Sequence, residues 1–213
     1  MKKFLFLASC CAAFALSAAE VANFDFTGAV PQASGKYSLP RFKKTEIGGD
    51  ENKRSLYFDG KDAVGTLFAK DFHILKGGSV VVKLKIADKK KNLHMIVVKP
   101  DEWWLARQGN KIYFNFCQGN KQAAYGVLVP CDWSKETTIG VSVFPDDTYI
   151  VCADGKVLKS GVLSINDSPC YNDKPITIGN GWGSVWSMLG DLYALRLYDE
   201  PLAEAELIEN TKL

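Results

Sequence analysis

Residues 137–163 read TTIGVSVFPDDTYIVCADGKVLKSGVL and hold three short runs typical of β-strands. The runs Thr137–Phe144, Thr148–Cys152 and Lys156–Leu163 are rich in Val, Ile and Thr, and turn residues separate them. Asp154-Gly155 stands between the second and third runs, and glycine tolerates the positive φ that a type I′ hairpin turn needs. The stretch therefore predicts antiparallel hairpins.

Short strand-like runs separated by turn residues continue on both sides of this stretch. Residues 28–52 are an exception, because they are rich in Gly, Pro and Ser and predict a long surface connection with little regular structure. Only the end of the chain looks helical, from Pro201 to Asn210. Many short strands with turns between them predict an all-β fold, a two-sheet antiparallel β-sandwich with a short C-terminal helix. The further strand-like runs are Phe24–Phe26, Ser55–Asp59, Ala63–Phe68, Ser79–Ile86, Leu93–Lys99, Glu102–Gln108, Lys111–Cys117, Ala123–Val129, Ile176–Gly179 and Asp191–Tyr198.

The N-terminus predicts export. Lys2 and Lys3 precede an apolar run that ends in Ser17-Ala18-Ala19, so residues 1–19 are interpreted as a signal peptide and residues 20–213 as a single domain. A lipoprotein anchor at Cys10 is the less favoured alternative, because the apolar run continues well past this cysteine. The expected location is secreted, periplasmic or cell-surface, and no other stretch approaches membrane-spanning length.

Composition and charge exclude several classes of protein. The 213 residues are 47% hydrophobic and 23% charged, which excludes a disordered, collagenous or coiled-coil chain. Removing Lys2 and Lys3 with the signal leaves 24 of the 26 basic residues against 24 acids, so the exported domain has no net charge. A neutral domain lacks the cationic field that nucleic-acid binding requires.

The cysteines fit an exported domain. Cys117, Cys131, Cys152 and Cys170 lie outside the signal peptide and allow two disulfides with three connectivities. Cys117–Cys131 with Cys152–Cys170 is the preferred pairing, because sequence-near partners close the smaller loops. A zinc site is disfavoured, since the spacings contain no Cys-x-x-Cys pair and the chain has two histidines.

Motifs of one domain family occur in order along nearly all of residues 20–213. The motifs are Leu56-Tyr57-Phe58-Asp59-Gly60-Lys61 with Ala63-Val64, Ser79–Ile86, Trp133 with Ile139–Val143, Asp154-Gly155-Lys156, Ile176-Thr177-Ile178-Gly179, and Gly190–Tyr198 followed by Leu202–Leu207. With them the chain resembles the laminin-G-like domains of the concanavalin A-like jelly-roll fold, a family that includes lectins and glucanases. The resemblance implies a jelly roll that binds either a glycan or a protein partner.

The resemblance also raises the question of structural calcium. Related jelly rolls carry an acidic pair in the last strand, where this chain has Tyr193 and Ala194. Asp25, Asp59 and Asp191 are the remaining calcium candidates, although scattered aspartates more often serve turns and hydrogen bonds than a ligand loop. No other cofactor is expected.

No catalytic motif stands out in the sequence. The Glu-x-Asp-x-x-Glu strand of glucanases on this fold is missing, and the neighbours Asp101 and Glu102 point to opposite sides of a strand. His94 lies alone in an apolar run, and there is no Gly-x-Ser-x-Gly elbow. The sequence therefore predicts that the domain is not an enzyme, and a glycoside hydrolase or polysaccharide lyase is the least favoured alternative.

The tryptophans suggest a function. Trp133 fits a core position, whereas Trp103 and Trp104 are adjacent, so on a strand one of them faces away from the core. Exposed indole rings stack on the flat CH faces of sugars. We therefore predict a lectin-like, non-catalytic module for an extracellular glycan, with a protein-interaction or adhesion module as the alternative. The candidate binding residues are Trp103, Trp104, Asn180, Trp182, Trp186 and Arg107.

Overall fold

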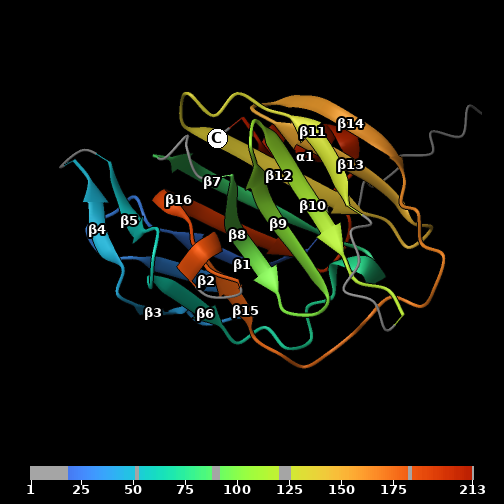
Figure 1. The fold of residues 1–213 in the computed structure, drawn as a ribbon, viewed down its shortest axis with the longest axis horizontal. Coiled ribbons are helices and arrows are strands. Elements are labelled where there is room, and N and C mark those ends of the chain that lie inside the picture. Colours follow the sequence, from blue (N-terminus) through green and yellow to red (C-terminus); the bar gives the residue numbers. More distant parts are fainter. Residues whose placement is uncertain (1–18, 51–52, 88–91, 120–125, 182–183, 213) are drawn as a thin grey trace, which may run out of the picture.

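The computed structural model describes residues 19–50, 53–87, 92–119, 126–181 and 184–212 (Figure 1). The predicted signal peptide, apart from Ala19, and Trp182 lie outside these residues. No helix among the described residues is long and apolar enough to cross a membrane.

Two antiparallel sheets make up the described part of the chain, as the sequence predicts. In Figure 1 the strands β8 to β11 of one sheet lie in front of β7 and β16 of the other. The nine-stranded sheet has the order β14-β13-β12-β7-β16-β1-β2, with β5 paired to β16 and β4 to β5. Its strands are β1 (Glu20–Asp25), β2 (Gln32–Gly35), β4 (Glu46–Gly49), β5 (Arg54–Asp59), β7 (Gly78–Ile86), β12 (Thr137–Val143), β13 (Thr148–Ala153), β14 (Lys156–Val162) and β16 (Leu189–Tyr198).

The seven-stranded sheet has the order β11-β10-β9-β8-β15-β6-β3. One helix, α1 (Glu204–Asn210), follows β16 at the predicted position, and its Leu207 is buried. Short 3₁₀ turns, η1 (Ile74–Lys76) and η2 (Ser184–Trp186), precede β7 and β16. The strands are β3 (Arg41–Lys43), β6 (Val64–Leu67), β8 (Leu93–Lys99), β9 (Trp103–Gln108), β10 (Lys111–Phe116), β11 (Val127–Pro130) and β15 (Ile176–Ile178).

The core lies between the sheets and follows the period of two that a strand imposes. Alternate residues of each inner strand point into one hydrophobic cluster, while their neighbours face outward. Buried rings from both sheets and their connections fill it. These rings include Phe24, Phe58, Phe72, Trp103, Phe114, Phe116 and Trp133.

The local turn chemistry predicted for residues 137–163 is confirmed. Asp154 and Gly155 have φ values of 49° and 73° and join β13 to β14. Positive φ at both central positions is the signature of a type I′ turn, whose twist matches that of the strands it connects.

The prediction for residues 28–52 is wrong in part, because β2, β3 and β4 lie within them. All four residues of β2 are exposed, and β2 pairs with β1 through its backbone from Ala22↔Gly35 to Asp25↔Gln32. A strand at a sheet edge that buries neither face needs no alternation of apolar side chains, so composition gives no signal for it.

One glycine fixes the path of the chain from β15 toward η2. Gly179 has a φ of 76°, and a Cβ added to it would lie 2.2 Å from Cδ1 of Phe58. The backbone therefore reverses directly against the core, and the following loop returns over the outer side of the seven-stranded sheet, where Gly181 approaches Met95.

Candidate functional site

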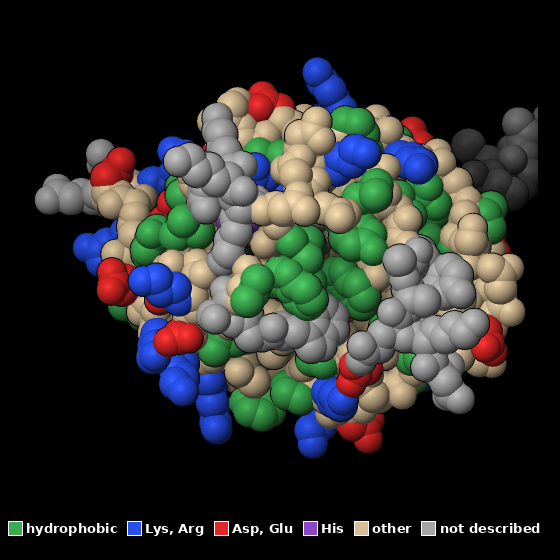
Figure 2. Space-filling view, viewed as in Figure 1, with side chains coloured by type: hydrophobic (Ala, Val, Ile, Leu, Met, Phe, Trp, Pro, Cys, Tyr) green, Lys and Arg blue, Asp and Glu red, His purple; other side chains and the backbone are tan. Residues whose placement is uncertain are grey.

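The outer side of β8, β9 and β10 carries a second apolar cluster, separate from the core. We call this surface the β8–β10 face. Figure 2 shows hydrophobic side chains gathered at its middle. The cluster consists of Met95, Val98, Trp104, Ala106 and Cys117, with Leu93, Tyr113 and Cys170 packed against it.

Strand register aligns side chains across this face in a row that crosses six strands. Residues directly opposite one another in paired strands project on the same side of a sheet. At about 4.8 Å per strand, the row spans about 24 Å from β3 to β10. We call it the Trp104 row; its members are Arg41, Thr66, Thr177, Val98, Trp104 and Asn115.

A parallel Tyr113 row runs beside it through Met95, Ala106, Tyr113 and Leu128. The rings of Trp104 and Tyr113 meet edge to face, with centroids 6.3 Å apart. The two rows therefore form one aromatic and aliphatic floor.

An unpaired acceptor lies at the end of the Trp104 row. Asn115 is buried, and its side-chain oxygen Oδ1 has no hydrogen-bond donor among the described residues. A buried acceptor without a donor costs free energy.

The two adjacent tryptophans divide as the sequence predicts, one to each side of β9. Trp103 has no exposed surface and packs in the core against Phe72 and Phe114. It cannot reach a ligand and is removed from the candidate binding residues. Trp104 faces outward but is only 8% exposed, so it serves as the floor of the β8–β10 face rather than as a free platform.

The loop after β15 brings a further tryptophan to this face. Ser187 forms a β-bridge with Met95 of the Tyr113 row, and the preceding Trp186 is 40% exposed. Asn180 is half-buried, and its backbone oxygen accepts a hydrogen bond of 2.7 Å from the Thr177 hydroxyl. Among the described members of the predicted set, Trp186 is therefore the most exposed ring, and the backbone of Asn180 holds the start of the loop to Thr177.

Arg107 does not belong to the face. Its side chain is 4% exposed, its Nε donates to the Gly109 oxygen at 2.7 Å, and its guanidinium carbon lies 5.8 Å from the centre of the Trp133 ring. Because Arg107 is an odd position on β9, it shares the inward side with Trp103. The prediction that Arg107 binds a ligand hydroxyl is therefore withdrawn.

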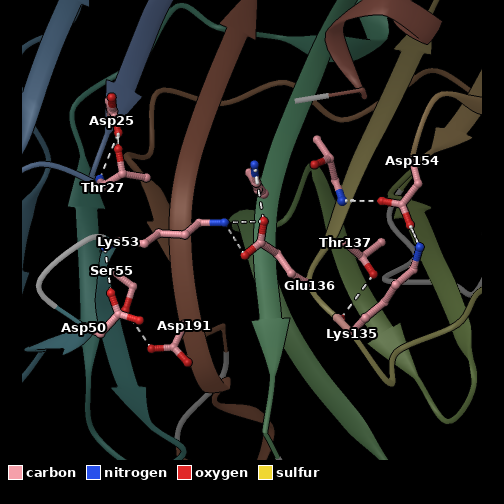
Figure 3. A network of polar contacts seen from close by, with 12 residues as sticks. Asp25, Thr27, Asp50, Lys53, Ser55, Lys135, Glu136, Thr137, Asp154 and Asp191 are labelled. Carbon is pink, nitrogen blue, oxygen red and sulfur yellow. Dashed lines mark hydrogen bonds and ion pairs between the residues drawn. The ribbon is translucent and has the colours of Figure 1, made fainter.

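The three calcium candidates serve local structure. Asp25 accepts from the Thr27 hydroxyl at 2.6 Å and Asp191 from the Ser55 hydroxyl at 2.7 Å, as Figure 3 shows. Asp59 accepts three backbone hydrogen bonds, from residues 61, 62 and 63, and these lower the pKa of its carboxyl despite partial desolvation. Within the described ranges no three His, Cys, Asp or Glu side chains gather as metal ligands, and calcium stays a prediction.

The outer side of the nine-stranded sheet carries ion pairs between lysine and glutamate side chains. Lys53 Nζ lies 2.7 and 2.6 Å from the two carboxylate oxygens of Glu136, and Lys83 Nζ lies 3.2 Å from one of them (Figure 3). Desolvation of Glu136 is outweighed by these two lysines, so its pKa is lowered. Ion pairs thus cover this part of the outer side, and α1 covers an apolar cluster that includes Val81 and Cys152.

The predicted disulfide pairs are not formed, and all four cysteines of the described chain carry free thiols. Cys152 lies beneath α1 with Val81 and Leu207, whereas Cys170 packs against the cluster of the β8–β10 face. A Cys152–Cys170 pair is therefore wrong, because the two residues lie on opposite outer sides of the sandwich.

A buried charged cluster was missed by the sequence analysis. Glu102 and Lys99 flank the β8–β9 turn with no exposed surface. His73 Nδ1 lies 3.1 Å from both carboxylate oxygens of Glu102, and the Asn172 backbone N–H donates to one of them at 3.3 Å. Lys99 Nζ donates to the backbone oxygens of residues 69, 70 and 72 at 3.2, 2.6 and 2.9 Å.

Burial shifts the protonation of this cluster. It raises the pKa of Glu102 to about 7 and lowers the pKa of His73, because the charged forms lose water. His73 also lines a cavity of about 240 Å³ together with Lys36, Tyr37, Asp71, Phe72, Lys76, Gly77 and Asp199.

An imidazole oriented by a buried carboxylate is an arrangement that serves proton transfer. The described residues lining this cavity include no Ser, Thr or Cys that His73 would activate, and one of its two carboxylates, that of Asp71, is held ionised. Hydrogen bonds from Lys36 and Tyr37 lower the pKa of Asp71 to about 2. The cluster therefore has the features of a structural network. The members of this network are far apart in sequence. The one sequence feature that could have indicated a buried charge is a glutamate, Glu102, directly before two tryptophans.

Comparison with known proteins bears on the fold alone. No protein-family model matches this sequence, and no curated protein matches it. Solved structures do match. The binding domain of Paraclostridial Mosquitocidal Protein 1 has a TM-score of 0.73 at 10% identity, with 89% of this chain covering 51% of that one. The chain shares its β-sandwich.

Two further neighbours agree. Domain 4 of AbnA, a GH43 extracellular arabinanase from Geobacillus stearothermophilus solved in complex with arabinotriose, has a TM-score of 0.69 at 13% identity, with 92% of this chain covering 99% of that one. The botulinum neurotoxin type G receptor binding domain has a TM-score of 0.69 at 13% identity, with coverages of 91% and 51%. The chain spans about half of each toxin domain and nearly all of the arabinanase domain. The likeness agrees with a jelly-roll-like fold.

Proposed function

We propose that the protein is an exported, non-catalytic carbohydrate-binding module whose binding surface is the β8–β10 face. The Trp104 row carries the proposal, because it crosses six strands and joins an arginine, two hydroxyls, an indole and an amide in one line. A glycan chain presents apolar CH faces and hydroxyl rims in alternation, so it needs such a mixed strip.

The accessible ring at this strip is Trp186. Trp186 is 40% exposed and directly precedes Ser187, which bridges to Met95. The hydroxyls of Thr66 and Thr177 lie on half-buried residues of the neighbouring strands. An aromatic ring supplies contact area with few rotatable bonds, so stacking costs little side-chain entropy.

Two observations support binding without catalysis. The Trp104 and Tyr113 rows contain no Asp or Glu, whereas glycoside hydrolysis generally uses two carboxylates flanking the bond that breaks. Among the structural neighbours, moreover, two are named as a binding domain and a receptor binding domain, and a third, domain 4 of AbnA, was solved with arabinotriose. Arabinan is therefore the first glycan to test.

Trp186→Ala should weaken glycan binding about 5- to 150-fold, because stacking of a flat ring on an aromatic side chain contributes about 1–3 kcal/mol. Affinity electrophoresis of the folded protein in gels containing arabinan and a panel of other soluble polysaccharides measures this as lost retardation. Val162→Ala is the matched control, since Val162 is 68% exposed on β14 of the other sheet, and its retardation should equal that of the unsubstituted protein.

The alternative, a protein-interaction module, predicts a different result. An apolar surface with a polar rim also suits a protein partner. Retardation by none of the polysaccharides would contradict the glycan proposal and favour this alternative. Equal loss in the Trp186→Ala and Val162→Ala variants would show that the binding surface lies elsewhere.

A further inference from the structure

Two cysteines far apart in sequence lie opposite each other at the end of β10. The Cys170 backbone N–H donates to the Cys117 oxygen at 3.1 Å, and the Gly119 N–H donates to the Ser168 oxygen at 2.9 Å. These two bonds flank the isolated antiparallel bridge between Gln118 and Pro169. In this register Cys117 and Cys170 are direct cross-strand partners.

Direct partners joined by an antiparallel hydrogen bond have Cα atoms about 5.5 Å apart and side chains on the same side of the sheet. Disulfides span Cα separations of about 4.4–6.8 Å. The shared side is confirmed by packing, because Cys117 belongs to the apolar cluster of the β8–β10 face and Cys170 packs against it. Neither Cys131 nor Cys152 belongs to this cluster.

The chain around Cys170 has the freedom that bond formation needs. Residues 163–175 contain no regular strand or helix, so Cys170 can move toward Cys117 without breaking a sheet. The Cys170 thiol is half-buried and donates to the Gly119 oxygen at 3.0 Å, whereas Cys117 is 2% exposed. Cys170 is therefore the thiol that an oxidant reaches first.

We propose that Cys117 and Cys170 are a redox pair that closes into a disulfide when the protein meets a low-molecular-weight disulfide as oxidant. The Cys170 thiolate attacks one sulfur of the oxidant, forms a mixed disulfide and releases one thiol. The Cys117 thiolate then attacks Cys170 and releases the second thiol, so two protons and two electrons leave the protein and the oxidant is reduced to two thiols.

Burial raises the pKa of Cys117 to about 11 and also raises the pKa of Cys170. The thiolate is the attacking form, so the reaction should be slow at neutral pH and faster as the pH rises toward 9. Once formed, the bond would tie the loop that carries Tyr171 and Asn172 to the end of β10. This loop borders the β8–β10 face and also contacts Glu102 through Asn172.

The test is peptide mapping of the full chain after incubation with oxidised glutathione at pH 8.5. Free thiols are alkylated under denaturing conditions, and the chain is digested without reduction. We expect a linked peptide pair containing Cys117 and Cys170, with Cys131 and Cys152 alkylated. Recovery of Cys117 or Cys170 alkylated, or linked to any other cysteine, would overturn the proposal.

Thermal unfolding provides a second measurement on the same samples. Closing a loop of this length should raise Tm by about 5–10 °C, and a reducing dithiol should remove the rise. Cys170→Ser should abolish the rise, whereas Cys152→Ser should retain it, whatever each substitution does to the Tm of the reduced protein. A rise of equal size in Cys170→Ser would contradict the assignment.

Discussion

Trp103→Ala should lower the free energy of unfolding by about 3–5 kcal/mol, the usual cost of removing a large aromatic side chain from a core. Trp103 has no exposed surface, and its ring centre lies 6.0 Å from that of Phe72 and 6.5 Å from that of Phe114. Removing it leaves a cavity between the sheets where β9 faces the 3₁₀ turn before β7. Equilibrium unfolding in urea, followed by far-ultraviolet circular dichroism, measures the change.

Two control variants test whether the loss of stability comes from the core position of Trp103. Trp186→Ala removes the same side chain from an exposed site and should change stability by less than about 0.5 kcal/mol. Trp103→Phe keeps much of the ring, and it deletes an indole N–H that has no acceptor among the described residues, so its cost should be well below that of alanine. Equal losses for Trp103→Ala and Trp186→Ala would contradict the placement of Trp103 in the core.

The sequence of β9 predicts that its side chains alternate, but it does not predict which side of the strand faces the core. Period-two alternation predicts that Trp103 and Trp104 lie on opposite sides, and they do. Which of them enters the core depends on pairing with β8 and β10, since a shift of one residue would exchange them. Both sides of β9 carry apolar residues, so the hydrophobic pattern of this strand does not indicate which tryptophan is in the core.

The same reasoning explains which other features were predictable. Strands with turn residues at both ends and the final helix follow from local chemistry, and the structure has them where the sequence indicates. The edge strands β2 and β4 show no alternation of apolar residues, because they pair through their backbone and add no side chain to the core, and β3 adds only Phe42, which packs against it. Composition cannot show such strands.

Contacts between distant segments were the least predictable part of the site. Cys117 and Cys170 are separated by 53 positions, and the preference for sequence-near cysteine partners pointed to other pairs. His73 and Glu102 meet only because the turn before β7 packs against the β8–β9 turn. Register and topology, rather than any motif, bring both pairs together.

Glu102→Gln should remove a pH-dependent contribution of roughly 3 kcal/mol to the free energy of unfolding. The pKa of Glu102 is raised from 4.5 to about 7 in the folded protein, because its carboxylate has lost water. The folded state therefore favours the protonated carboxyl. This contribution to stability is fully present below pH 4.5 and is lost as the pH rises through 7, at about 1.4 kcal/mol per unit of pKa shift.

His73 changes stability with pH in the opposite direction to Glu102, so removing Glu102 should alter the pH dependence clearly. Its pKa is lowered from 6.5, so the fold favours the neutral imidazole and gains stability as the pH rises. The unsubstituted protein combines both trends, whereas Glu102→Gln retains only that of His73. The charged groups acting on this pair besides each other are Lys76, Lys99, Asp71 and Asp173.

Urea unfolding of both proteins at pH 5 and pH 8 measures the difference. From pH 5 to pH 8 Glu102→Gln should gain stability relative to the unsubstituted protein, and Glu46→Gln, on an exposed residue of β4, should follow the unsubstituted protein at both. Parallel pH dependences for Glu102→Gln and the unsubstituted protein would mean that Glu102 stays ionised in the fold. In that case the positive charge of Lys99 and the hydrogen bonds from His73 and Asn172 would together have to offset the full desolvation of a buried carboxylate, and the His73 bond would need to strengthen well beyond a 3.1 Å contact shared between two oxygens.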